Sequence, residues 1–189
     1  MPRGKAPAAR VGVRDRLLDA ADRLFYNEGV RAVGIDRVLV EADAAKASLY
    51  AHFGCKDELV AAYVERRSLE ARAAIEAYLA DVPPAERALR FFDWVIAWTE
   101  SADFRGCPMQ PAAGELADRK HPARVLAASQ REWIQAKFLE WVRAARVKEP
   151  QATAGALVVL FDGAVVAAEQ DGPQRARDAR WLAKVLLSR

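Results

Sequence analysis

The residues best suited to recognising another molecule fall within residues 45–53, which read AKASLYAHF. At helical spacing, Leu49 and Phe53 share one face and point into the protein. The opposite face carries a cation, a methyl, a hydroxyl, a phenol and an imidazole, from Lys46, Ala47, Ser48, Tyr50 and His52. Such groups contact phosphates, base edges and thymine methyls in DNA. A merely solvated helix is the alternative, but an exposed Tyr50 is costly on a surface that meets only water.

Aromatic side chains after residue 90 form a second group of candidates, and all five tryptophans lie there. Within residues 85–99, Phe91, Trp94 and Trp98 form an apolar face beside the one that would meet the core. One helix seldom needs two apolar faces for packing alone, so the second face indicates a cavity. Any single aromatic residue at helical spacing is more often part of a simple core, and this alternative stays open.

We therefore expect a ligand cavity between this helix, the long helix before it and the helices that contain Met109 and Trp133. Its walls would be largely apolar, with a few polar groups converging on the ligand. The predicted ligand-binding residues are Phe91, Trp94, Trp98, Cys107, Met109, Gln110, Glu115, Gln130, Trp133 and Phe161. Such walls predict a small apolar or aromatic effector.

Other reactive residue types give weaker signals. Cys107 has the position of an electrophile or redox sensor, but a small loop residue is the favoured interpretation because Arg105 is its one basic neighbour. His52 and Cys55 have metal-like spacing, yet two ligands do not make a site. The sequence therefore predicts no metal, no cofactor and no catalytic residue.

An all-helical enzyme with a hydrophobic pocket is the main rival hypothesis. The sequence has no phosphate-binding glycine loop, no HExxH and no nucleophile elbow. Glu115 with His121 is the one nameable acid–base pair, and its spacing across a proline-bounded loop is ordinary. We expect the protein not to be an enzyme. A DNA-bound adaptor whose core binds a protein, through an open groove, is a third hypothesis.

The composition sets the fold that must position these groups. The chain has 189 residues, 52% hydrophobic and 29% charged, which is typical of a globular protein. Forty alanines against two threonines and four isoleucines favour helices over sheets. The apolar run 154–168 contains Asp162 and is too short to span a bilayer, and the N-terminus lacks the apolar core of a secretory signal. With two lone cysteines, an all-α cytoplasmic protein without a membrane partner is predicted.

Apolar periodicity and Gly/Pro breaks divide the chain into helices. The expected helices are 13–28, 35–42, 45–53, 56–80, 85–99, 109–117, 122–146, 151–170 and 174–187. The second and third are short and joined by a three-residue turn, and the first braces them. This is the helix-turn-helix arrangement, whose second helix lies in the major groove of DNA.

Residues 13–60 resemble the TetR family of transcriptional regulators. The most specific pieces are Leu24-Phe25 before a glycine, the Leu49-Tyr50-x-His52-Phe53 signature, and Lys56-x-Glu58-Leu59. The resemblance implies a homodimeric, ligand-responsive, DNA-binding regulator, usually a repressor. It also implies a three-helix reading domain joined by a long helix to a ligand-binding and dimerisation core.

Carried over by position, Lys46, Ala47 and Ser48 would sit at the groove, and Tyr50 and His52 at its edge or at phosphates. Lys56 and Arg37 would meet phosphates. The chain also departs from the family pattern. Asp43 replaces the usual turn glycine and must adopt a turn or left-handed conformation, which aspartate tolerates. Gly34, Ala45 and Cys55 stand where helix-capping serine or threonine is common.

Three segments are expected: a basic arm at 1–9, the DNA-binding domain at 10–66, and the ligand-binding and dimerisation domain at 67–189. Residues 1–14 carry Arg3, Lys5, Arg10 and Arg14 and no acid. This arm is a phosphate-contacting element or, equally, a solvated tail. The net charge of the whole chain is only +3.

The helix at 151–170 is apolar on most sides. One face would meet the core, and the other would meet a second copy, because small residues let helices approach closely. The predicted interface residues are Ala156, Leu160, Gly163, Ala164 and Ala167. With the helix at 122–146, this face would form a four-helix interface that holds two reading helices on a palindromic double-stranded operator. A deeply buried monomer core is the alternative.

Overall fold

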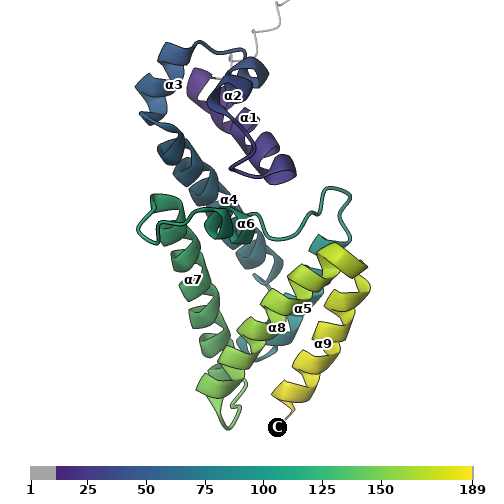
Figure 1. The fold of residues 1–189 in the computed structure, drawn as a ribbon. Coiled ribbons are helices and arrows are strands. Elements are labelled where there is room, and N and C mark those ends of the chain that lie inside the picture. Colours follow the sequence, from purple (N-terminus) through teal and green to yellow (C-terminus); the bar gives the residue numbers. More distant parts are fainter. Residues whose placement is uncertain (1–11, 189) are drawn as a thin grey trace, which may run out of the picture.

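The structure is a computed structural model that describes residues 12–188 (Figure 1). The described chain folds into α-helices and one short 3-10 turn and contains no strand, so the predicted all-α class is confirmed. The elements are α1 (Val13–Glu28), α2 (Ile35–Ala42), α3 (Lys46–Phe53), α4 (Lys56–Tyr78), η1 (Pro84–Glu86), α5 (Arg87–Thr99), α6 (Met109–Glu115), α7 (Pro122–Ala144), α8 (Pro150–Asp171) and α9 (Gln174–Leu187). The expected basic arm at 1–9 lies outside the described residues.

Helices α1 to α3 form the helix-turn-helix head. Leu49 and Phe53 are buried against α1, as the periodicity of α3 predicts. Asp43 ends α2 in the left-handed conformation, with φ 46° and ψ 57°. Arg16 of α1 holds this turn, since its guanidinium donates hydrogen bonds to the backbone oxygens of Ala42 and Asp43, both at 3.1 Å.

Helix α4 connects the head to the rest of the molecule. Near its start, Leu59, Tyr63 and Val64 are buried in the core of the head. About three turns further on, Ile75 belongs to a second core. Residue 66, where we expected the domain boundary, therefore lies inside one continuous helix of 23 residues.

The second core is built by α5, α7, α8 and α9. Phe91, Phe92 and Phe138 are fully buried at its centre and meet edge to face or tilted, with Phe91 and Phe138 ring centroids 5.0 Å apart. Figure 1 shows α8 and α9 side by side at the far end from the head, and α6 crossing between head and core.

Helix α8 is longer than the apolar run in the sequence suggests. It has 22 residues, and its most apolar 18-residue stretch has a mean hydropathy of 1.6, so it meets the length and composition of a membrane span and run length alone does not exclude one. Its packing argues for a core helix instead, because it lies between α7 and α9 and its Asp162 pairs with Arg131 of α7. Only 33% of its most apolar stretch is buried, so one apolar face stays uncovered in the single chain.

Candidate DNA interface and ligand cavity

The outward face of α3 is available for contact. Lys46, Ala47 and His52 are exposed, Tyr50 keeps 45% of its surface, and Ser48 is half-buried. Helices α2, α3 and α4 begin without a side-chain cap, because Gly34, Ala45 and Cys55 make no capping hydrogen bond there. The structure thus presents the predicted recognition residues together on one short helix.

The expected phosphate-binding cations already have partners within the chain. Arg37 forms a two-pronged ion pair with Glu28. Lys56 donates from Nζ to the backbone oxygen of Val30 at 2.7 Å, which ties the start of α4 to the α1–α2 connection. The exposed Arg37–Glu28 pair contributes little free energy, whereas the Lys56 hydrogen bond is partly buried.

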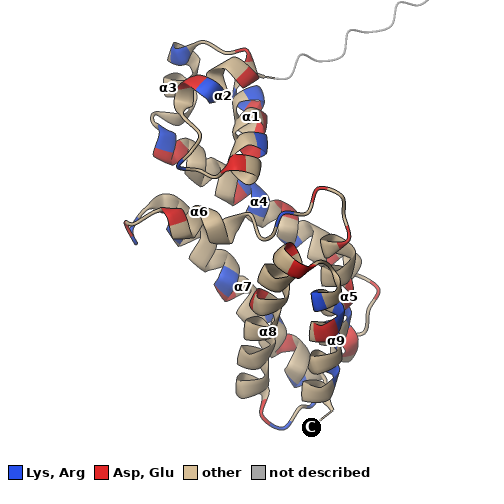
Figure 2. Ribbon diagram, turned by 45° about the vertical axis from the view of Figure 1, so that its right-hand side comes forward, with Lys and Arg blue, Asp and Glu red and all other residues tan. Residues whose placement is uncertain are grey.

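Acidic and basic side chains are interspersed over the head (Figure 2). Residues 12–60 contain seven Lys or Arg and nine Asp or Glu, so this part of the chain is not basic overall. A general attraction of residues 12–60 to DNA would therefore rest on a few placed cations and not on an overall positive charge.

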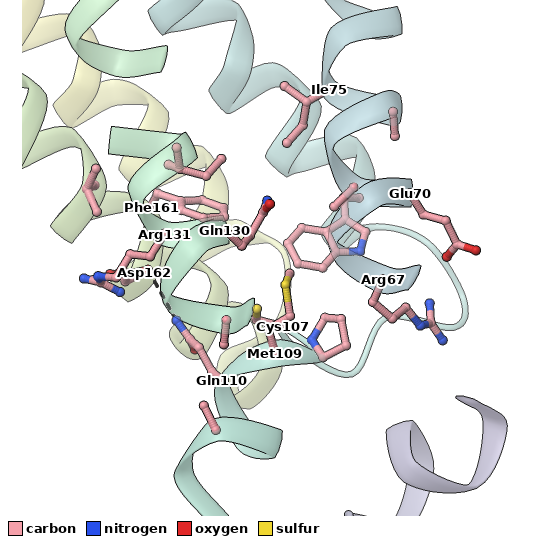
Figure 3. Close-up of a pocket in the computed structure, with 18 of the residues that line it drawn as sticks. Arg67, Glu70, Ile75, Cys107, Met109, Gln110, Gln130, Arg131, Phe161 and Asp162 are labelled. Carbon is pink, nitrogen blue, oxygen red and sulfur yellow. Dashed lines mark hydrogen bonds and ion pairs between the residues drawn. The ribbon is translucent and has the colours of Figure 1, made fainter. Parts of the chain in front are cut away.

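A cavity of about 640 Å³ opens between the head and the core, walled by α4, α5, α6, α7 and α8 (Figure 3). This is where the two apolar faces of residues 85–99 predicted it. Seven of the ten predicted residues line it: Trp94, Trp98, Cys107, Met109, Gln110, Gln130 and Phe161. The rings of Trp94 and Trp98 stack on one wall, with centroids 5.4 Å apart.

Three predicted residues lie elsewhere. Phe91 is fully buried in the core against Phe138, because its position on α5 points deeper than that of Trp94. Trp133 does not line the cavity, and Arg72 of α4 and Lys137 lie over its ring. Glu115 instead accepts a hydrogen bond from the backbone N–H of Arg31 at 2.7 Å, beyond the end of the cavity.

The charged residues of the cavity wall were missed from the sequence. Arg67 pairs with Asp22 of α1 at 2.6 and 2.7 Å, and Arg131 pairs with Asp162. Arg124 donates to the backbone oxygen of Leu116 at 2.7 Å. Arg124 and Arg131 are seven residues apart, with cavity-lining Ala127 and Ala128 between them at helical spacing, and this period was the available signal.

Cys107 lies in the wall with little reactive character. Burial raises the pKa of its thiol above the ordinary 9.0, and this outweighs the opposing effect of the N–H groups of Met109 and Gln110. Burial also raises the pKa of the Tyr26 phenol, whose oxygen donates to Gly106 and accepts from the backbone of Arg105 at 2.8 Å. Both groups therefore stay protonated near neutral pH and add no charge to the cavity.

The groups named for catalysis or metal binding serve other contacts. His121 caps α7, because its Nδ1 accepts a hydrogen bond from the N–H of Ala123 at 3.1 Å. Its Nε2 lies 3.5 Å from a carboxylate oxygen of Asp57. Across residues 12–188, no cluster of three or more His, Cys, Asp or Glu could hold a metal ion.

The exposed apolar surface at the end of the core differs from the expected interface in one respect. On α8, the predicted Gly163 is exposed, Ala156, Leu160 and Ala167 are half-buried, and Ala164 is buried. The neighbouring apolar surface belongs to α9 rather than α7, since Trp181 is 64% exposed and Leu182 44%. Helix α7 packs against α4, α6 and α8 and keeps an outward face on which Val125 is 57% exposed.

Comparison with known protein families gives independent evidence on the family of this chain. The family model described as bacterial regulatory proteins, tetR family, matches residues 17–63, from α1 into the first turns of α4. The chain is similar to the HTH-type transcriptional regulator Rv1255c of Mycobacterium tuberculosis, with 32% identity over 120 residues. That match covers 61% of the chain, and the chain spans 59% of the length of this relative.

Longer likenesses include the cavity helices. HTH-type transcriptional regulator LmrA of Bacillus subtilis is 27% identical over 159 residues, covering 81% of the chain and 84% of the relative. The crystal structure of SCO4454, a TetR-family transcriptional regulator from Streptomyces coelicolor, superposes with a TM-score of 0.88 at 30% identity, covering 93% of this chain and 94% of that one. The crystal structure of a TetR-type regulator from Streptomyces avermitilis superposes with a TM-score of 0.85 at 31% identity, covering 94% of this chain and 97% of that one.

Proposed function

Because the chain belongs to the TetR family of bacterial transcriptional regulators, we propose that it is a homodimeric repressor that leaves a palindromic operator when a small apolar or aromatic effector fills the cavity. Members of this family are DNA-binding transcription factors and not enzymes, which answers the catalytic alternative. The proposed location is the cytoplasm. The observation that carries the proposal is the continuity of α4, which runs from Lys56 beside α3 to Ile75 in the cavity wall.

In this proposal, residues 10–66 read DNA and residues 67–189 bind the effector and the second copy. Helix α3 enters the major groove, where Lys46, Ala47 and Ser48 meet base edges. Tyr50 and His52 lie at the groove edge or at phosphates. Lys56 and Arg37 bind phosphates, and Arg37 exchanges its ion pair with a glutamate for one with DNA.

The second copy joins through α8 and α9, whose uncovered apolar surface supports this choice. A two-fold axis between them sets two α3 helices on one face of the DNA, about 34–36 Å apart for adjacent major grooves. A dimer is needed because one reading helix contacts too few base pairs to select a site in a genome.

Coupling between cavity and operator passes through α4. Arg66 and Arg67 of α4 pair with Asp19 and Asp22 of α1, so the head follows α4 when it tilts. Arg67 also lines the cavity. An effector that binds ~100-fold more tightly to the tilted state supplies about 2.7 kcal/mol per site, enough to empty an operator.

The experiment that tests this function is capture of sheared genomic DNA from the source organism on the purified protein, followed by sequencing. We expect a short palindrome to be enriched. Smeared recovery without a palindrome contradicts sequence-specific regulation. An effector found for this regulator must weaken operator binding, and the operator must weaken effector binding by the same factor, since linkage is reciprocal.

A further inference from the structure

We propose that the amide nitrogen of Gln130 selects the effector, and that the effector is an apolar molecule with a carbonyl or carboxylate oxygen placed against this nitrogen. The inference rests on the proposed function, because it takes the cavity to be the effector site. It narrows the effector from any apolar compound to one that carries a hydrogen-bond acceptor at a defined place.

The orientation of the Gln130 amide is fixed by its neighbours. Ser68 Oγ donates to its Oε1 at 2.8 Å, and Arg72 Nε donates to the same oxygen at 2.6 Å. A guanidinium only donates, so the atom that faces Arg72 must be the oxygen and the opposite atom must be the NH2 group. Figure 3 shows Gln130 projecting from α7 among the residues that line the cavity.

The NH2 group of Gln130 is left to the ligand. The residue is only 6% exposed, and no described residue accepts a hydrogen bond from its Nε2. This nitrogen is not among the fully buried side-chain atoms that lack a partner, so it is open to the cavity. A ligand that covers it with carbon leaves the donor unpaired, and a ligand that brings an oxygen to this point therefore binds better. By contrast, the amide nitrogen of Gln110 on the facing helix already donates to Asp162 at 3.3 Å.

The charges around the cavity favour the same class of ligand. Arg67 and Arg131 are neutralised by Asp22 and Asp162. Arg124 of the wall has only the backbone oxygen of Leu116, and none of the described carboxylates lies within ion-pair distance of it. Glu70, the remaining acid of the wall, lies 3.8 Å from the guanidinium of Arg66. The excess of positive charge attracts an acceptor or an anion and disfavours a cationic ligand.

Gln130 also joins the two helices that must move relative to each other. Its oxygen binds Ser68 and Arg72 of α4, while its backbone belongs to α7. An effector oxygen bound to Nε2 is therefore held by the same amide group whose oxygen accepts the hydrogen bonds from α4. Recognition and transmission are thus combined in one side chain.

The test uses four para-substituted biphenyls of similar size: the carboxylic acid, the acetyl ketone, the ethyl hydrocarbon and the methylamine. Binding to the full chain is followed by quenching of tryptophan fluorescence, since Trp94 and Trp98 lie in the cavity wall. We expect the acid and the ketone to bind at least about 10-fold more tightly than the hydrocarbon, and the cationic amine to bind most weakly. If the ketone binds as tightly as the acid, the preference belongs to the acceptor oxygen. If the acid binds more tightly than the ketone, attraction to the charge of Arg124 contributes as well.

Gln130→Met keeps the length of the side chain and removes the donor, together with the oxygen that Ser68 and Arg72 bind. We expect the ketone to fall to the affinity of the hydrocarbon in this variant, while hydrocarbon binding is retained and reports a folded cavity. Gln110→Met is the matched control, because it removes an amide whose nitrogen is already bonded, and the preference for oxygen should survive there.

Equal affinities for ketone and hydrocarbon in the unaltered protein overturn the inference without any variant. Equal loss of preference in both methionine variants overturns it as well. Failure of all four probes to bind also overturns it, while operator capture still decides the regulatory function separately. If the four probes bind in the expected order but no palindrome is enriched in operator capture, the proposed ligand chemistry is supported and the regulatory function is rejected.

Discussion

Lys46 and Lys56 are the two side chains whose removal best separates reading of a sequence from general attraction to DNA. Lys46 is exposed on α3, the proposed recognition helix, whereas Lys56 is the first residue of α4. We expect Lys46→Ala to change the preferred operator sequence. Lys56→Ala should weaken binding to all sequences alike. It should also make the slope of log binding constant against log salt concentration shallower by about one. Binding titrations at several salt concentrations, with operator and scrambled DNA, measure both effects.

Lys56→Arg is the matched control for this pair, because it keeps the charge and a donor toward the Val30 oxygen. Its salt slope should equal that of the unaltered protein. Lys56→Ala also releases the α1–α2 connection, so a loss of thermal stability is expected with it. The assignment of roles fails when both alanine variants lose sequence preference to the same degree.

Cys107 gives a second prediction for single residues. The pKa of its thiol is raised by burial, so less thiolate is present at pH 8 than in an ordinary cysteine, and alkylation is slow. We expect iodoacetamide to label exposed Cys55 first and Cys107 only as the pH rises above the ordinary cysteine range. Mass spectrometry after timed labelling checks this order. Faster labelling of Cys107 than of Cys55 would show a reactive sensor instead.

At the scale of elements, the recognition helix begins without a side-chain cap. Ala45 has the extended backbone of a capping residue, with φ −76° and ψ 148°, but no oxygen to accept the free N–H groups of the first turn. We expect Ala45→Ser to stabilise the protein by about 1 kcal/mol, or about 2–4 °C in Tm. Thermal unfolding followed by circular dichroism measures the change. Ala47→Ser adds the same hydroxyl inside the helix and should not raise Tm.

The helices themselves were predictable because periodicity and breaks are local properties of a sequence. The turn at Asp43 was predicted from the family resemblance, because Asp43 replaces the usual turn glycine, and its left-handed backbone is confirmed. Helices α6 and α7 each end two residues before the predicted end, where no residue type forces a stop.

The cavity was predictable in its place but only partly in its residues. The helical periodicity of residues 85–99 placed Trp94 and Trp98 on the face that lines the cavity. The roles of Phe91, Trp133 and Glu115 depended on which neighbouring helix covers each one, and no single helix carries that information. The amide orientation of Gln130 likewise depends on Ser68 and Arg72, about sixty residues earlier in the chain.

At the scale of the whole molecule, the uncovered surface of α8 and α9 predicts how two copies meet. Trp181 is 64% exposed in the single chain, so its replacement should cost little in folding. We expect Trp181→Glu to weaken dimerisation by about 2 kcal/mol or more, roughly 30-fold, and to weaken operator binding with it. Light scattering after size exclusion and operator titration measure the two effects.

Val125→Glu is the matched control, because Val125 is a 57% exposed apolar residue on α7, the helix named for the interface from the sequence. It should leave the dimer intact. A dimer broken by Val125→Glu and kept by Trp181→Glu would return the interface to α7. Two unchanged dimers would place the contact elsewhere.

The mixed charge of the head has a consequence for how few copies of this regulator a cell needs. Random DNA holds a protein mainly through its cations, and residues 12–60 offer nine acids against seven bases. A genome presents about 10⁶ or more competing non-operator sites, so even weak random binding sequesters most of a strongly basic regulator. With nine acids against seven bases, residues 12–60 gain little from that general attraction, and binding depends on contacts that form when α3 fits the groove. We therefore expect few copies to be held on random DNA, so that each operator is vacated or refilled quickly as the effector concentration changes.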